Sequence, residues 1–372
     1  MYYTERVISL LIYCLILVIV VLAIELTKIP HRRILFLYTI CLSIMGYAFM
    51  PMDNLDLYRI NKIMVAYSKY DFNGLYKNVL ADSYVIFADL IYWLIGKTGT
   101  LALLPTITAF VSYSCIFYTI NRTAEIYKIN RGNISIAILF LMSVGTYIFV
   151  ISGIRTMLGI SLLVFCFFRE TIEKKFNIFH PFLYLIAALL HQFVAVLFFA
   201  RIIIAVVNQK SFLLKIAFFI ILGIVLYLSR NLLDGWFANI QDKGSDYIGG
   251  KVSFSQPWGY VIGTICGIVA SAVIIQFNKI DFKTKKSFFA YKIFLVITLI
   301  GAVIFSFEYT IFHRLITYVV PIIILPFLML YLQNRSDRKD FWGKTIMIFA
   351  SFGLLFVSCS QGALGALQFF VF

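Results

Sequence analysis

The fold class is decided by Val7-Ile-Ser-Leu-Leu-Ile-Tyr-Cys-Leu-Ile-Leu-Val-Ile-Val-Val-Leu-Ala-Ile-Glu-Leu26, the first long apolar stretch of the chain. A helix needs about 20 mostly apolar residues to cross a bilayer, and this stretch has that length. It is too long for the apolar region of a signal peptide, and no small-x-small cleavage site lies before Lys28. We therefore expect a retained first membrane helix.

Apolar stretches of the same kind follow one another along the 372 residues of the chain. Apolar residues make up 62% of the sequence, charged residues make up only 13%, and the mean hydropathy is +0.94. A soluble domain does not carry that much apolar surface. The sequence therefore predicts one membrane domain over 1–372, an all-α polytopic bundle with about 12 transmembrane helices. The candidate spans are 7–26, 34–51, 100–120, 134–152, 155–168, 178–190, 192–207, 212–229, 258–277, 288–307, 312–332 and 345–366.

The net charge of +15 rests on 32 Lys and Arg residues, which gather in short clusters between the apolar stretches. They form no continuous basic face, which argues against nucleic acid as a partner. Basic clusters of this kind are typical of the cytoplasmic loops of membrane proteins. The clusters that we expect to face the cytoplasm are 28–33, 122–131, 169–175, 210–215, 279–286 and 335–344.

The stretch 83–96 is apolar apart from Asp89, but its length of about 14 residues is too short for a full crossing. Counting it as a span would put 122–131, or else every later basic cluster, on the wrong side of the membrane. The sequence therefore predicts a re-entrant or interfacial segment near 83–96 and an outer N-terminus.

Two long polar loops, 51–82 and 230–257, then fall on the outer side. Carboxylates, amides and aromatic rings together suit sugar binding, because hydroxyls accept and donate hydrogen bonds and the apolar faces of pyranosides stack on rings. Two solvated loops anchored by interfacial aromatic residues would have the same composition. The candidate side chains in these loops are Asp53, Asp56, Tyr58, Arg59, Asp246 and Tyr247.

Three ionisable residues lie within or beside apolar stretches, where a charge costs at least ~2.5 kcal/mol at the bilayer centre. Arg155 opens a span, and its guanidinium fork matches phosphate oxygens; an arginine that snorkels to lipid headgroups is the alternative. Arg314 has a similar place, but a structural pair with Glu308 explains it equally well. His191 lies between two apolar runs, where it could accept a proton near neutral pH or simply hydrogen-bond at a helix break.

Neither a metal site nor a disulfide framework is indicated. All six cysteines lie within apolar stretches and have no CxxC or Cys/His spacing. No DxD motif is present, and Asp53 and Asp56 at i, i+3 make only an incomplete oxygen cage. The sequence therefore predicts metal independence and no cofactor.

Four short motifs follow one another over most of the chain. Asp53-Asn-Leu-Asp56-Leu-Tyr58 is an acidic and tyrosine stretch, and Gly153-Ile-Arg155 opens a helix. Leu190-His191-Gln192 lies inside an apolar run, and His313-Arg314-Leu-Ile-Thr-Tyr318 comes shortly before a proline. In order and spacing they resemble the EpsG/Wzy-type bacterial polysaccharide polymerases. This chain departs from the family at Thr156, where Gln is common, so an amide that would assist Arg155 is missing.

The resemblance implies a GT-C-like membrane glycosyltransferase on the outer side of the bacterial cytoplasmic (inner) membrane. Such an enzyme transfers the growing chain from undecaprenyl diphosphate to a hydroxyl of the next lipid-linked repeat unit, and it builds capsule, exopolysaccharide or O-antigen. Its partners are the lipid-linked oligosaccharide donor and acceptor and the membrane lipids. A chain-length regulator and a flippase are candidate protein partners.

This reaction needs charge stabilisation for the departing diphosphate and a base for the attacking hydroxyl. Arg155 and Arg314 can supply the first, and His191 is the candidate base, with Asp53 and Asp56 as alternatives. The residues expected to bind substrate are Tyr58, Arg59, Asp246, Tyr247 and Tyr318.

Two other classes of protein stay open. A flippase or transporter of lipid-linked oligosaccharide would use the same basic cavity, although alternating access tends to leave internal repeats and the two halves of this chain show no similarity. A membrane acyltransferase that modifies a polysaccharide would need a histidine facing a thioester, usually with a cytoplasmic donor site, whereas His191 falls on the outer side in the predicted topology.

Overall fold

The computed structural model describes residues 2–53, 55–83, 85–144, 146–207, 282–304, 312–333, 337–360 and 367–369. Within these residues the chain is helical and has no strand, and an isolated antiparallel bridge joins Phe49 to Phe369. The all-α prediction is confirmed for this part of the chain. The predicted spans 212–229 and 258–277 lie outside the described residues, as does the loop 230–257.

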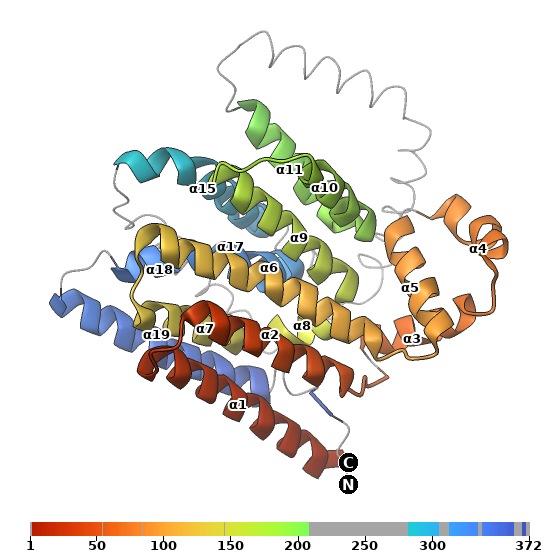
Figure 1. Cartoon of the computed structure of the whole chain (residues 1–372), viewed down its shortest axis with the longest axis horizontal. Coiled ribbons are helices and arrows are strands. Elements are labelled where there is room, and N and C mark those ends of the chain that lie inside the picture. Colours follow the sequence, from red (N-terminus) through yellow and green to blue (C-terminus); the bar gives the residue numbers. More distant parts are fainter. Residues whose placement is uncertain are drawn as a thin grey trace.

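Each predicted span within the described residues lies mostly in one helix or in consecutive helical elements, and further short helices lie between the spans (Figure 1). In chain order they are α1 (Tyr2–Leu26), α2 (His31–Tyr47), α3 (Asp56–Tyr67), α4 (Phe72–Asn78), the 3-10 turn η1 (Leu80–Asp82), α5 (Ile86–Thr98), α6 (Leu103–Tyr127), α7 (Arg131–Ser143), α8 (Thr146–Ser152), α9 (Ile154–Thr171), α10 (Phe179–Leu190), α11 (Gln192–Val207), α15 (Phe282–Ile304), the π-helical turn η2 (Arg314–Val319), α17 (Val320–Ile323), α18 (Leu325–Gln333) and α19 (Asp337–Ser360).

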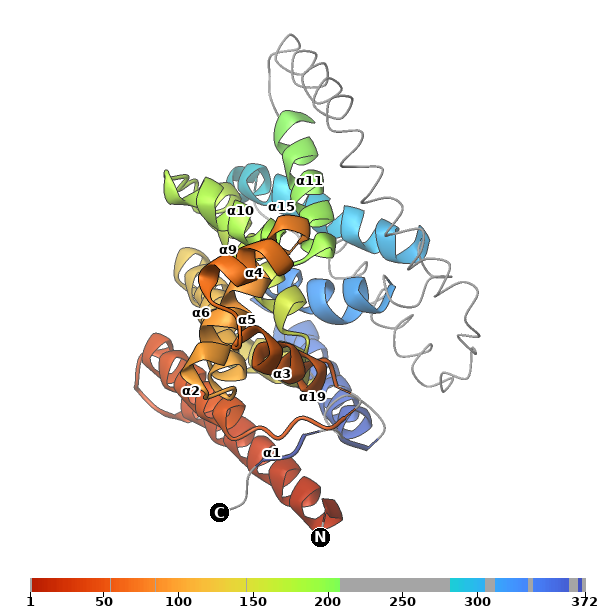
Figure 2. The same cartoon turned by 90° about the vertical axis from the view of Figure 1, so that its right-hand side faces the viewer.

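The long helices pack side by side around α6. This helix contacts α2 on one side and α9 on the other, α10 packs on α9, and both α1 and α19 pack on α7. The short helices α3, α4 and α5 form a separate group at one end of the long helices (Figures 1 and 2). The molecule therefore has an apolar bundle with a small helical cap at one end.

Buried tyrosines join the helices at the centre of the bundle. Tyr147 stacks on Tyr13 and Tyr113, with ring centroids 5.6 Å and 6.3 Å apart. The hydroxyl of Tyr13 donates to the carbonyl oxygen of Met142 (2.8 Å), and that of Tyr147 donates to the carbonyl oxygen of Leu42 (3.0 Å). A phenol is tolerated in an apolar bundle when its hydroxyl finds such a partner. These bonds fix α1, α2, α7 and α8 relative to one another.

By length and composition, two helices in the described part can cross a membrane, Arg6–Leu26 and Leu103–Tyr127. Two bent pairs, α7 with α8 and η2–α17 with α18, raise the number to four if each pair is one span. On α1 the side chains of Leu11 and Leu15 are 64% and 60% exposed, as expected for a helix that faces lipid. The chain is therefore a helical membrane protein.

The segment 51–82, predicted as an outer loop, is largely helical, because it contains α3, α4 and η1. The buried side chains of α3 are Leu57, Ile60 and Met64, which have the i, i+3, i+7 spacing of one helix face. Polar residues between them give the segment its loop-like composition. A helical segment holds its side chains in fixed places, so it can form one wall of a site.

Ion pairs cluster at the far end of α9. Helix α9 begins beside α3 and runs for 18 residues, so its last turn lies about 27 Å away at 1.5 Å per residue. There Glu170 pairs with Arg201 of α11 and accepts a hydrogen bond from the hydroxyl of Tyr184 (2.9 Å), and Glu173 pairs with Arg122 (2.5 Å). These pairs coincide with clusters that the sequence assigns to the cytoplasmic side.

Candidate functional site

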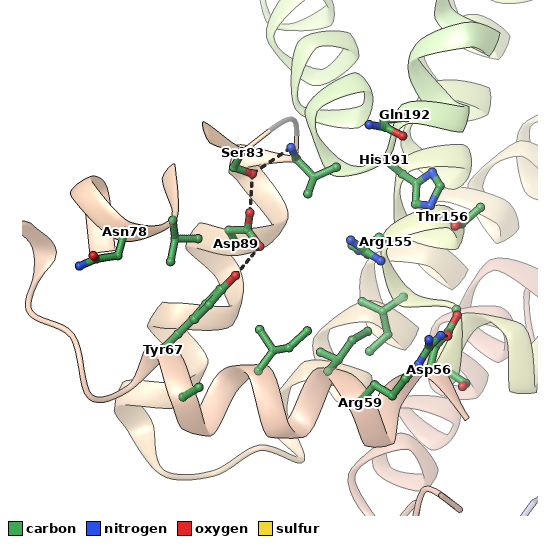
Figure 3. Close-up of a pocket in the computed structure, with 18 of the residues that line it drawn as sticks. Asp56, Arg59, Tyr67, Asn78, Ser83, Asp89, Arg155, Thr156, His191 and Gln192 are labelled. Atoms are coloured by element: carbon green, nitrogen blue, oxygen red, sulfur yellow. Dashed lines mark hydrogen bonds and ion pairs between the residues drawn. The ribbon is translucent and has the colours of Figure 1, made fainter. Parts of the chain in front are cut away.

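A cavity of about 1190 Å³ lies where the cap of short helices meets the bundle. Its walls come from α3, the segment from η1 to α5, the junction of α8 and α9, the break between α10 and α11, and the start of η2 (Figure 3). Segments far apart in the sequence thus meet in one place. The ionisable side chains that line the cavity include Asp56, Arg59, Asp89, Arg155, His191 and Arg314.

Arg155 projects from the N-terminal turn of α9. Gly153 lies between α8 and α9, and a Cβ there would sit 2.9 Å from the carbonyl oxygen of Phe149 and 3.3 Å from the hydroxyl of Tyr318. Only glycine allows this close approach. Among the described residues, the Arg155 guanidinium makes no hydrogen bond and no ion pair, and it points into the cavity (Figure 3). The N-terminus of a helix also favours a negative group, so this wall is suited to an anion.

Arg314 adds a second guanidinium to the cavity lining. It is the first residue of the π-helical turn η2, a kind of turn that often marks a functional position. Glu308, the partner that the sequence offers for Arg314, lies outside the described residues. Within the described part of the chain, the Arg314 side chain makes no hydrogen bond or ion pair. Besides Arg59, which is paired with Asp56, two guanidinium groups without an ion-pair partner in the described residues therefore line the cavity.

His191 occupies the break between α10 and α11. Its backbone is extended, and its carbonyl oxygen accepts from the N–H groups of Val194 (2.9 Å) and Ala195 (3.1 Å), so His191 caps the N-terminus of α11. Its ring atom Nδ1 accepts a hydrogen bond from the backbone N–H of Phe193 (3.0 Å). A nitrogen that accepts carries no proton, so the proton of the neutral ring lies on Nε2. The predicted role of His191 as a base needs a free lone pair, and this geometry favours a hydrogen-bond donor instead.

Asp89 faces Arg155 across the cavity (Figure 3). It lies on α5 and is 8% exposed. Its Oδ2 accepts from the hydroxyl of Ser83 (2.5 Å), and its Oδ1 accepts from the hydroxyl of Tyr67 at 3.4 Å. Burial raises the pKa of Asp89 above its ordinary value, while Ser83, Arg155 and Tyr67 act in the opposite direction. The sequence reasoning missed this residue, although a lone carboxylate in an apolar segment was a usable signal.

Three other predicted residues lie in or near α3. Asp56 and Arg59 line the cavity and form an ion pair with each other. Tyr58 is not in the lining; its ring lies 4.4 Å from the Nζ atom of Lys62. Asp53 is exposed and also lies outside the lining. The structure therefore brings together Asp56 and Arg59 but not Asp53 or Tyr58.

Tyr318, predicted to bind substrate, packs behind the cavity wall. Its ring lies 4.7 Å from that of Phe149 and 5.6 Å from that of His313, and its hydroxyl approaches Gly153. This position supports the turn that carries Arg155. Asp246 and Tyr247, the remaining predicted substrate-binding residues, lie outside the described residues.

In the described ranges, no three side chains of His, Cys, Asp or Glu gather closely enough to hold a metal ion. Among the described residues, guanidinium groups and the N-terminus of α9 offer positive charge to an anionic ligand in this cavity.

The wall that carries Asp89 depends on close packing at Gly96, where a Cβ would overlap the carbonyl oxygen of Met64. Gly96→Val must push α5 away from α3, which we expect to lower the free energy of unfolding by about 1–3 kcal/mol. Thermal unfolding of the purified protein measures this change. Gly353→Ala on α19 is the matched control, because nothing lies within 4 Å of its Cβ. An unchanged midpoint for Gly96→Val would contradict the packing of α3 on α5.

The fold and the cavity together define a helical membrane protein with a polar, partly basic binding site at one end of its bundle. A sequence model of the EpsG family matches residues 67–371, and the chain belongs to this family, that of the Wzy/EpsG-type polysaccharide polymerases. The resemblance read from the four motifs is thereby confirmed. Comparison with curated proteins gives no match, and comparison with solved structures gives none either.

The matched region covers three of the four motifs. It begins at Tyr67, so the stretch Asp53–Tyr58 precedes it. Most of the cavity lining falls within the match, including the charged or titratable side chains of Asp89, Arg155, His191 and Arg314. Asp89 and Arg155, which face each other across the cavity, thus both lie inside the region that matches the family.

Proposed function

We propose that this chain is a membrane glycosyltransferase that polymerises undecaprenyl-diphosphate-linked oligosaccharide repeat units on the outer side of the bacterial cytoplasmic membrane. The growing chain moves from its lipid diphosphate to a hydroxyl of the next lipid-linked unit, which yields capsule, exopolysaccharide or O-antigen. The observation that carries the proposal is the single cavity in which the Arg155 guanidinium faces the Asp89 carboxylate. About twelve spans in a GT-C-like arrangement are part of the same proposal.

One wall of the cavity suits the leaving diphosphate. Negative charge grows on this group as the bond to the sugar breaks, and donors already in place stabilise that charge without further reorganisation. Arg155 and Arg314 supply guanidinium forks that match phosphate oxygens, and His191 lines the same cavity. The N-terminus of α9 adds its dipole.

The opposite wall suits the acceptor. Asp89 offers a carboxylate, while Tyr67 and Ser83 offer hydroxyls, and sugar hydroxyls hydrogen-bond to both kinds of group. The volume of about 1190 Å³ exceeds the roughly 300–1,000 Å³ of ordinary small-molecule pockets. There is therefore room for the ends of two oligosaccharides, which a polymerase must hold at once.

Removal of the gene from the source bacterium tests the proposal. Cells without this chain should accumulate single lipid-linked repeat units on the outer leaflet and lose the long polymer. A plasmid copy should restore the polymer. If the units accumulate on the inner leaflet instead, the chain is a flippase, and if polymer of full length persists without its acyl groups, it is an acyltransferase.

The substitution His191→Asn distinguishes two roles of His191, that of a helix cap and hydrogen-bond donor and that of a general base. Asparagine keeps a side-chain acceptor for the Phe193 N–H and an N–H donor, but it cannot accept a proton near neutral pH. We expect His191→Asn to keep polymer formation within about tenfold of wild type, whereas His191→Ala loses the cap, worth about 1 kcal/mol, and the donor together. Polymer length in complemented cells and thermal unfolding are the measurements. An inactive but fully stable Asn variant would restore the base role.

A further inference from the structure

We propose that Asp89 is the general base of this enzyme, accepting the proton of the acceptor hydroxyl as that hydroxyl attacks the donor sugar. This inference rests on the proposed function and assigns a residue that the motif reasoning left out.

Two hydrogen bonds hold the carboxylate of Asp89 in place, and its oxygens can accept further hydrogen bonds. Ser83 donates to Oδ2 at 2.5 Å, and Tyr67 donates to Oδ1 only at 3.4 Å, a long and weak bond. Each carboxylate oxygen can accept two hydrogen bonds. Oδ1 can therefore take a sugar hydroxyl in addition to, or instead of, Tyr67. A base fixed from two sides is positioned for proton transfer within hydrogen-bond reach.

The other candidate bases are less suited. Asp56 is paired with Arg59, so its negative charge is already shared. Asp53 does not line the cavity. The Nδ1 lone pair of His191 is used by the N–H of Phe193. Among the described lining residues, Asp89 is then the carboxylate that faces the Arg155 wall without an arginine bound to it.

The step balances as a direct displacement. The acceptor oxygen forms a bond to the anomeric carbon of the donor sugar while the bond from that carbon to the phosphate oxygen breaks. The bonding electron pair leaves with the lipid diphosphate, whose negative charge Arg155 and Arg314 stabilise. The hydroxyl proton passes to Asp89, which later releases it to water. One displacement without a covalent intermediate inverts the anomeric centre.

The charges around Asp89 set the expected pH dependence. The groups that act on its charge are Tyr67 on α3, Ser83 just before α5 and Arg155 on α9, and Tyr92 lies near it on α5 itself. Burial raises the pKa of Asp89, which brings the base closer to the working pH. The active form is the carboxylate, so the rate should fall as the pH drops through this raised pKa.

The test uses the full-length chain in nanodiscs and lipid-linked repeat units extracted from cells that lack the gene. Turnover is measured against pH for wild type, Asp89→Asn and the matched control Asp71→Asn. Asp71 is exposed, lies outside the cavity and caps α4 through Gly74, a bond that asparagine can keep. Binding of farnesyl diphosphate, a short polyprenyl diphosphate, is measured in parallel as a readout of the Arg155 wall.

We expect Asp89→Asn to lower turnover by about 10²–10⁴-fold, the usual contribution of a general base, while the Kd for farnesyl diphosphate stays within about twofold. Asp71→Asn should match wild type. Full turnover in Asp89→Asn would overturn the assignment and leave polymerisation standing. Loss of turnover together with loss of binding would mean that Asp89 positions Arg155 instead. A wild-type protein that makes no polymer would overturn the proposed function itself.

Tyr67→Phe tests the same assignment without removing the carboxylate. The Tyr67 hydroxyl bonds to the charged form of Asp89 and so lowers its pKa. Without that hydroxyl the pKa rises, and the acid limb of the pH–rate profile should move to higher pH. An acid limb that stays in place would show that Asp89 is not the group that titrates.

Discussion

Arg155→Ala is expected to abolish polymer formation and to leave the fold intact. The guanidinium lies at the centre of the cavity, opposite Asp89, with no partner among the described residues that its loss would leave unpaired. Removal of one donor that stabilises charge in a transition state costs about 10²–10³-fold in rate, and a full positive charge next to a diphosphate should lie at the upper end. Arg155→Lys keeps the charge but loses the fork, so it should retain a few per cent of the activity.

Turnover of lipid-linked units and the Kd for farnesyl diphosphate measure this effect. Lys97→Ala is the matched control, because Lys97 is an exposed cation on α5 outside the cavity. Arg155→Ala should weaken the binding of farnesyl diphosphate but not of farnesol, which lacks the phosphates. If Arg155→Ala kept wild-type turnover, the cavity would not be the site of the leaving diphosphate.

Glu170→Ala is expected to cost the most stability. The Arg201 side chain is 14% exposed, and Glu170 holds it through Nε (3.1 Å) and a second, shorter contact. Removal of the carboxylate leaves a partly buried guanidinium without a counter-charge and removes the acceptor of Tyr184. Breaking a fully buried pair from one side typically costs about 3–5 kcal/mol, so this partly buried pair should lie near the lower end of that range.

Thermal unfolding in detergent measures the loss. Asp56→Ala offers a comparison, since the side chains of the Asp56–Arg59 pair are 50% and 74% exposed and such pairs contribute about 0–1 kcal/mol. Glu170→Gln should fall between wild type and Glu170→Ala, because the amide oxygen can still accept from Tyr184. Equal unfolding midpoints for Glu170→Ala and Asp56→Ala would show that the Glu170–Arg201 pair does not hold α9 to α11.

The basic side of the cavity could be predicted from the sequence because its residues interrupt apolar runs. Arg155, His191 and Arg314 are costly in such places, and the cost itself signals a function. The structure places all three in one cavity. Their roles were harder to predict, because the hydrogen bond from Phe193 that changes the reading of His191 depends on the geometry of a helix break.

The acidic side of the cavity was harder to predict from the sequence than the basic side. Asp89 lies in a segment too short for a full crossing, and its place opposite Arg155 depends on the packing of α5 against α3, α10 and α6. The polar residues of α3 give it the composition of a loop, although the spacing of Leu57, Ile60 and Met64 is typical of one helix face. Contacts between segments far apart in sequence are what a single sequence does not contain.

Polymer synthesis by the purified chain tests the central claim most directly. The protein is placed in nanodiscs with lipid-linked repeat units from cells that lack the gene, and no nucleotide sugar is added. The account predicts a ladder of products that lengthens by one repeat unit at a time and releases one lipid diphosphate at each step. Units that stay single in the presence of a folded protein that binds farnesyl diphosphate would contradict it.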